Sequence, residues 1–199
     1  MGKEKNYTIS EINKITINLL IKKLSTMNKI NDDPYINVYP SLVEYVSRQK
    51  KDIHSLISIS HMVYGWMPTI IKFRLNNNDF DPWKNIKAGS LKKEFIIQMK
   101  DCINNSIVGT SKFLHFTNPD KYAIWDSRVY RSITKKRVNY NQINNVEIFI
   151  AYTKKLRELA AFAEIEKLKK DLIKKGYCNS KVSNLRVIEL IFFYTPPPE

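Results

Sequence analysis

The stretch Gly109-Thr-Ser-Lys-Phe-Leu-His-Phe-Thr-Asn-Pro-Asp-Lys-Tyr-Ala-Ile-Trp-Asp126 contains an apolar segment with one lysine, a turn, and an apolar run that ends in one aspartate. The apolar spacing predicts a short helix over about residues 108–116, with Lys112 on its apolar face. Asp126 comes directly before a second segment of helical period, 127–133, which is the ordinary position of a helix N-cap. A lysine and a carboxylate placed in this way can act together on one bound molecule.

Outside this stretch nearly every segment also repeats its apolar residues with the helical period, and alternation with a period of two is rare. We therefore expect an all-α fold, a bundle of about eight helices that forms a single domain over residues 1–199. The Asn-rich segment 76–85 is the clearest loop and predicts two packed subdomains, 1–80 and 81–199. Further helices are expected at residues 8–27, 40–50, 53–67, 69–75, 90–103, 146–175 (as one helix or two) and 180–194.

The chain is strongly basic, with 33 lysines and arginines against 19 acidic residues and a net charge of +14. Such a balance favours polyanionic partners, although a solvated basic surface without a partner is the alternative. Part of the charge follows Asp126 directly, where it would lie beside a phosphate backbone bound at the same place. These residues, named the 128–137 cations below, are Arg128, Arg131, Lys135, Lys136 and Arg137.

Lysine and aspartate together suit chemistry at a sugar. A lysine amine becomes a nucleophile when burial or a nearby cation lowers its pKa, and at a sugar C1′ it can displace a base and form a Schiff base. A carboxylate nearby would stabilise the cationic sugar. The alternatives are that Lys112 is a surface lysine lying along apolar neighbours and that Asp126 only caps a helix.

Aromatic side chains around the motif are candidates for a base pocket. Enzymes that extrude a base hold it between aromatic or apolar side chains and read its edge by hydrogen bonds. We expect Trp66, His115, Phe116 and Trp125 to line such a pocket. Packing in the core is the alternative for the aromatic residues, and a buried, hydrogen-bonded histidine is the alternative for His115.

Other classes of site have no support in the sequence. The two cysteines are far apart, and neither they nor the three histidines show the spacing of zinc ligands. We expect no metal, and base excision by a lysine needs no organic cofactor. The N-terminus shows no leader pattern and no apolar run approaches a membrane span, so we expect a cytoplasmic monomer without a membrane partner.

The segment Thr110-Ser-Lys-Phe-Leu-His-Phe116, followed by an apolar run and Asp126-Ser-Arg-Val129, resembles the helix-hairpin-helix DNA glycosylase superfamily. It is most similar to small bacterial proteins with an 8-oxoguanine-glycosylase fold. The resemblance covers about residues 108–133 and implies a helix-hairpin-helix glycosylase-like fold. It also implies that Lys112 attacks the sugar and that Asp126 stabilises the transition state.

The hairpin before the lysine departs from the superfamily pattern. Where that pattern usually reads Leu-Pro-Gly-Val-Gly, this chain has Ser106-Ile-Val-Gly109, with one glycine and no proline, and its lysine-to-aspartate interval is shorter. The resemblance implies that Gly109 and Ser111 contact a DNA phosphate.

Together these features predict a glycosylase that excises a damaged or modified base from double-stranded DNA. Whether it also cleaves the strand as an AP lyase stays open. Three alternatives stay open. They are a non-catalytic nucleic-acid-binding module, as in phage defence or a mobile element, an RNA-acting toxin, and a helical protein-binding module.

Overall fold

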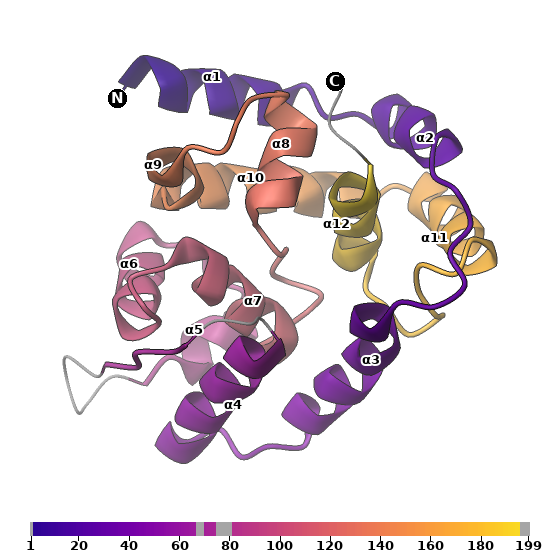
Figure 1. The fold of residues 1–199 in the computed structure, drawn as a ribbon. Coiled ribbons are helices and arrows are strands. Elements are labelled where there is room, and N and C mark those ends of the chain that lie inside the picture. The colour runs from indigo at the N-terminus through magenta and orange to yellow at the C-terminus, as the bar shows by residue number, and fades with distance from the viewer. Residues whose placement is uncertain (1, 67–69, 75–80, 196–199) are drawn as a thin grey trace.

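The computed structural model describes residues 2–66, 70–74 and 81–195, whose regular elements are twelve α-helices (Figure 1). The all-α class is confirmed, but the expected count of about eight helices is wrong for this described part. The helices are α1 (Gly2–Asn13), α2 (Ile17–Ser25), α3 (Pro34–Ser47), α4 (Ile53–Trp66), α5 (Trp83–Ala88), α6 (Lys93–Cys102), α7 (Ile107–Thr117), α8 (Ser127–Thr134), α9 (Tyr140–Ile143), α10 (Val146–Ala160), α11 (Glu164–Lys174) and α12 (Asn184–Tyr194).

The count is larger because a side-chain cap divides one expected helix and because the short helices α5 and α9 were not expected. The expected helix 8–27 is two helices, since the hydroxyl of Thr16 accepts a hydrogen bond from the Leu19 amide and starts α2. Residues 146–175 form two helices, α10 and α11, which is one of the two expected outcomes, and α11 begins without a side-chain cap. The helix expected over 69–75 is wrong for residues 70–74, where Phe73 forms an isolated antiparallel bridge with Ile103, while 69 and 75 lie outside the described residues.

The helices form two groups that do not follow the order of the chain (Figure 1). In one group α1 packs against α8 and α10, and α2 packs against α11 and α12. In the other group α3, α4 and α6 pack against α7. The two groups meet where α10 packs on α6 and α7. The first two helices therefore lie with the C-terminal helices, on the other side of the molecule from α3 and α4.

One continuous apolar core joins both groups. Its largest fully buried side chains come from α7, α10, α12 and the segment before α8, and they include Phe113, Tyr122, Trp125, Phe149 and Phe192. The quoted stretch thus runs through the centre of the molecule. Burial on this scale fixes the backbone on both sides of Lys112 and Asp126.

A four-residue turn between α6 and α7 sets the start of α7. Asn104 and Asn105 both adopt the left-handed conformation, with φ of 55° and 50°, which asparagine tolerates better than most residues. The side-chain amide of Asn104 donates to the Ile70 carbonyl at 2.9 Å, and that of Asn144 donates to the Asn105 carbonyl at 2.9 Å. Ser106 then caps α7 by accepting a hydrogen bond from the Gly109 amide at 3.2 Å.

Gly109 of α7 packs tightly against Tyr64 of α4. A Cβ atom at this position would lie 2.2 Å from the hydroxyl oxygen of the buried Tyr64. The absence of a side chain at Gly109 is therefore a packing requirement, and its backbone amide is already used in the helix cap.

We expect Gly109→Ala to destabilise the protein by about 1–3 kcal/mol, because the added methyl group forces Tyr64 out of its position. Urea denaturation followed by circular dichroism measures this change. Gly65→Ala is the matched control, since nothing lies within 4 Å of its Cβ position, and it should leave stability unchanged or raise it. Equal stability of both variants would contradict the packing role.

Candidate functional site

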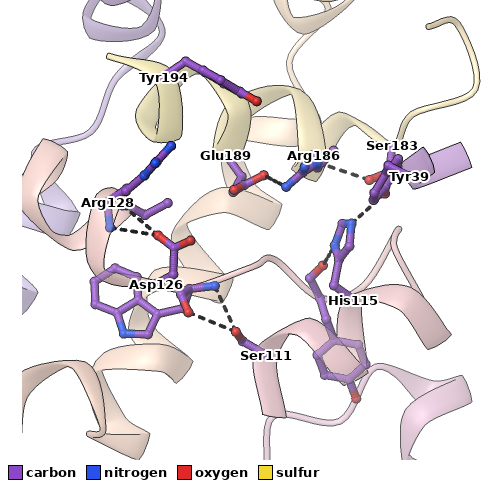
Figure 2. Close-up of polar contacts among 12 residues, drawn as sticks. Tyr39, Ser111, His115, Asp126, Arg128, Ser183, Arg186, Glu189 and Tyr194 are labelled. Atoms are coloured by element: carbon purple, nitrogen blue, oxygen red, sulfur yellow. Dashed lines mark hydrogen bonds and ion pairs between the residues drawn. The ribbon is translucent and has the colours of Figure 1, made fainter. Parts of the chain in front are cut away.

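Lys112 and Asp126 are held in place by hydrogen bonds between the residues that precede them. The hydroxyl of Ser111 accepts a hydrogen bond from the Trp125 amide at 3.1 Å and lies 3.1 Å from the Trp125 carbonyl (Figure 2). Both residues are fully buried. The second turn of α7 is thereby fastened to the segment that leads into α8. Ser111, expected at the DNA backbone, lies inside the protein.

The Lys112 amine lies in a partly buried site beside an aromatic ring. Its Nζ is 5.2 Å from the centre of the Trp66 ring, a distance at which a cation is attracted to the ring face. Burial lowers the pKa of Lys112, while the carboxylates of Asp126 and Glu189 act in the opposite direction. A lowered pKa increases the neutral fraction of the amine, which is the form that can attack carbon.

Asp126 both caps α8 and faces the site. Its side chain is 7 % exposed, and Oδ1 accepts hydrogen bonds from the amides of Arg128 and Val129 at 3.0 Å each (Figure 2). The expected cap is therefore confirmed. The cap uses one oxygen, and Oδ2 makes no hydrogen bond with the part of the chain that the structure describes. Asp126 can therefore cap α8 through Oδ1 while its charge acts on Lys112.

A buried ion pair on α12 completes the set of charges. The guanidinium of Arg186 donates to Oε2 of Glu189, and both side chains are almost completely shielded from solvent (Figure 2). Oε1 of Glu189 has no hydrogen-bond partner among the described residues. Burial raises the pKa of Glu189 to about 7 although Arg186 opposes the shift, and the charge on Asp126 raises it further.

Arg186 connects this pair to the aromatic side of the site. Its guanidinium carbon is 4.8 Å from the Tyr39 ring centre and 6.0 Å from the Trp66 ring centre. Trp66 therefore lies near both Lys112 and Arg186. The Trp66 ring also meets Phe116 edge to face, with 5.2 Å between the ring centres, and Phe116 is fully buried.

His115 has both ring nitrogens occupied. Its Nδ1 donates to the Tyr122 carbonyl at 2.7 Å, so its Nε2 accepts from the Tyr39 hydroxyl at 2.7 Å (Figure 2). Burial, with a smaller effect from Arg186, lowers the pKa of His115 to about 3. The imidazole is therefore neutral and holds α3 against α7, as in the buried-histidine alternative.

We expect His115 to make stability depend on pH. Its pKa falls from 6.5 to about 3 on folding, so the unfolded chain binds this proton more readily. The neutral imidazole stabilises the fold fully above pH 6.5, and this contribution is lost as the pH falls toward 3, by at most about 1.4 kcal/mol per pH unit.

Urea denaturation between pH 7 and pH 4 measures this slope. His115→Gln should be less stable than the unmodified protein at pH 7 but should lose less stability on acidification. His54→Gln removes an exposed histidine and serves as the control. Parallel pH profiles for the His115 variant and the unmodified protein would contradict the burial of a neutral imidazole.

Trp125 belongs to the core beneath the site. It is fully buried, its indole Nε1 donates to the Ile143 carbonyl at 3.1 Å, and its ring lies 4.8 Å from that of Tyr152. These contacts correspond to the packing alternative. They also give Asp126 a rigid support, because the residue before it cannot move without disrupting the core.

The 128–137 cations are all exposed, on α8 and the turn that follows it. Arg128 lies 4.6 Å from the Phe193 ring centre, and Lys136 lies 3.7 Å from the Tyr7 ring centre. Lys135 ends α8 in the left-handed conformation. This surface begins at the Asp126 cap, so positive charge extends outward from the site.

Arg186 and Glu189 were not among the residues expected at the site. The sequence did contain a signal for them, because these two charged residues stand three positions apart in the otherwise apolar run 185–193. A charged pair with this spacing on an apolar helix face is rarely buried unless it is paired. Only the fold shows that α12 brings this pair to Lys112, which is more than seventy residues earlier.

Other kinds of site are not found in the part of the chain that the structure describes. There, no three histidine, cysteine or acidic side chains are grouped to hold a metal ion. None of the helices in that part is long and apolar enough to cross a membrane.

The chain matches no protein-family model, no curated protein and no solved structure. The chemistry of the Lys112 site is therefore the basis on which a function is inferred.

Proposed function

We propose that this chain is a DNA glycosylase that removes a damaged or modified base from double-stranded DNA through attack of Lys112 on the sugar. The observation that carries the proposal is the setting of the Lys112 amine. It is partly buried, with a lowered pKa, and two buried carboxylates and the Trp66 ring lie around it. A lysine that only lay along the surface would keep its amine in water.

The proposed reaction uses these groups directly. The lone pair of Nζ attacks C1′ while the electron pair of the glycosidic bond leaves with the base nitrogen. Asp126 stabilises the positive charge that develops on the sugar. The new secondary ammonium then loses one proton. The C1′–O4′ bond breaks, O4′ keeps its electron pair and takes up a proton, and the nitrogen lone pair forms the C=N bond of a protonated Schiff base between Lys112 and the sugar.

Base binding is assigned to the aromatic side of the site. Trp66 and Phe116 meet edge to face next to Lys112, and a π-face of Trp66 lies near the amine. An extruded base gains stacking energy on such a ring. The indole Nε1 of Trp66 is buried without a hydrogen-bond partner among the described residues, so a base can satisfy it.

Backbone binding is assigned to the 128–137 cations. They are exposed, they continue from the Asp126 cap, and they belong to a chain with a net charge of +14. Contacts of this kind with phosphates should make DNA affinity fall steeply with salt concentration.

The proposal is tested by a base-release assay on duplexes that carry oxidised, deaminated, alkylated or hypermodified bases, with matched RNA duplexes alongside. Release of one class of base from DNA supports it. Tight, salt-sensitive binding without release from any substrate would indicate a non-catalytic binding module. A preference for RNA would indicate an RNA-acting protein, and binding that does not weaken with salt would indicate a protein-binding module.

A further inference from the structure

Glu189 is a buried carboxylate with only half of its hydrogen-bonding capacity used. It is fully buried, Arg186 holds Oε2, and Oε1 has no partner among the described residues. Leaving a buried carboxylate oxygen unpaired costs free energy, and such groups in native proteins call for an explanation in function or bound solvent. The explanation must involve the groups that face Oε1.

The groups around Glu189 come from several helices. From α7 and the α8 cap come Lys112 and Asp126, both of which act on the pKa of Glu189. Phenolic hydroxyls also lie close enough to respond to its charge, namely those of Tyr39, Tyr152 and Tyr194. The remaining cations of this region have other contacts. Arg128 lies over the Phe193 ring, and Lys23 of α2 donates a hydrogen bond to the Ser132 hydroxyl. Burial raises the pKa of Cys178, and Lys169 of α11 opposes this shift.

Lys112 is the group in this set that must lose a proton before it can react. Its amine and the Arg186 guanidinium both lie over Trp66, at 5.2 Å and 6.0 Å from the ring centre. The ion pair therefore places Glu189 in the region of the Trp66 ring where the amine also lies, although no hydrogen bond or ion pair within 4.0 Å joins Lys112 to Glu189 among the described residues. Asp126 also has one oxygen outside its cap, Oδ2, but the proposed function already uses its charge to stabilise the sugar cation.

We infer that Glu189, held by Arg186, accepts the proton that Lys112 must lose before it attacks the sugar. This inference rests on the proposed function. In this step an N–H bond of the Lys112 ammonium breaks and its electron pair stays on Nζ. The proton passes to one bridging water, which gives up another of its protons to form an O–H bond with Oε1. The products are a neutral amine and a neutral carboxylic acid, and the proton is then available to the base nitrogen that leaves.

A role in proton transfer predicts a result that a purely electrostatic role does not. Glu189⁻ raises the pKa of Lys112, so Glu189→Gln should lower that pKa and increase the free amine. If Glu189 only supplied charge, the variant would be faster at low pH. If Glu189 takes the proton, the variant has more free amine and is nevertheless slower.

The first measurement needs no DNA. Reductive methylation with formaldehyde and cyanoborohydride at pH 7, with mass spectrometry of the Lys112 peptide, reports the free amine. We expect labelling of Lys112 in Glu189→Gln to be faster than in the unmodified protein by about threefold or more. Glu158→Gln, which removes an exposed carboxylate paired with Lys155, should leave labelling of Lys112 unchanged. Equal labelling in all three proteins would overturn the coupling.

The second measurement is the pH profile of single-turnover base release. Since the pKa of Glu189 is about 7, the unmodified enzyme should lose rate as the pH falls through 7. Glu189→Gln should be slower by about 10²-fold at pH 8, and its remaining limb should lie at lower pH, because the variant lowers the pKa of Lys112, whose neutral form is still needed. A decrease of less than about tenfold at pH 8, or a limb that stays at pH 7, would overturn the inference.

Two controls keep the inference separate from folding and from the proposed function. Glutamine at position 189 can still accept the hydrogen bond of Arg186, so Glu189→Gln should fold. If it does not fold, Glu189→Asp replaces it. Glu189→Asp keeps the charge but moves the carboxylate away from Lys112, so it should slow base release without faster labelling of Lys112. If the unmodified protein releases no base, the proposed function fails, and the labelling result alone decides whether Glu189 controls the Lys112 amine.

Discussion

Lys112→Gln is expected to reduce base release by about 10⁴-fold or more, because it removes the nucleophile and leaves a side chain of similar length. Binding to the same duplex should change little, since the 128–137 cations are untouched. Single-turnover release and fluorescence anisotropy at one fixed salt concentration measure the two effects. Loss of both binding and release together would indicate a damaged fold, and circular dichroism distinguishes that case.

Lys51→Gln is the matched control for this variant. The Lys51 amine also lies 5.2 Å from a tryptophan ring, that of Trp83, and burial also lowers its pKa. Burial is the cause of the lowered pKa of Lys51, whereas the carboxylates of Asp126 and Glu189 also act on the pKa of Lys112. Full activity of Lys51→Gln together with inactivity of Lys112→Gln would assign the chemistry to the site. Equal activity of the two variants would remove Lys112 from the mechanism.

Asp126→Asn is expected to slow base release by about 10²–10³-fold while leaving the fold intact. Asparagine is as good an N-cap as aspartate, so the hydrogen bonds to the amides of Arg128 and Val129 survive. The variant therefore removes the charge alone. Its free energy of unfolding should stay within about 0.5 kcal/mol of the unmodified protein.

Asp126→Ala separates capping from chemistry. It removes the charge and the cap, so it should lose about 1 kcal/mol of stability in addition to the loss of activity seen in Asp126→Asn. Urea denaturation and single-turnover release on both variants provide the comparison. Full activity of Asp126→Asn would mean that Asp126 is a helix cap only, and the sugar cation would then need another stabilising group.

The place of Lys112 on α7 and that of Asp126 at the cap of α8 could be predicted because the signals for them are local. Lys112 sits on an apolar helix and Asp126 precedes the next helix, and both positions follow from spacing within eighteen residues. The hydrogen bonding between Ser111 and Trp125, which links these two positions, has no sequence signal. The sequence does not distinguish a buried serine from an exposed one.

The contribution of α12 to the site could not be predicted either, and the reason is different. Period and spacing show which face of a helix is apolar, but they do not show which helix it packs against. The pairing of Arg186 with Glu189 could be predicted from their spacing, whereas their position beside Trp66 depends on the packing of α12 against α8 and α10.

Some helix boundaries could not be placed because the local signals were weak or misleading. The choice between one helix and two over 146–175 stayed open, because the break between α10 and α11 falls at Ala161-Phe-Ala163, which contains neither glycine nor proline. Pro40, expected near a helix start, lies inside α3, which begins at Pro34 under an Asp33 cap. The helices α5 and α9 have six and four residues, too few to show a period.

The most direct test of the Lys112 mechanism is borohydride trapping on the panel of modified duplexes, followed by mass spectrometry of the cross-linked peptide. A Schiff base between the enzyme and the sugar is reduced to a stable adduct, so the attacking residue is identified by its mass. We predict an adduct with one class of substrate, located on Lys112 and absent in Lys112→Gln. An adduct on a different residue, or an equal yield from Lys112→Gln, would contradict the mechanism.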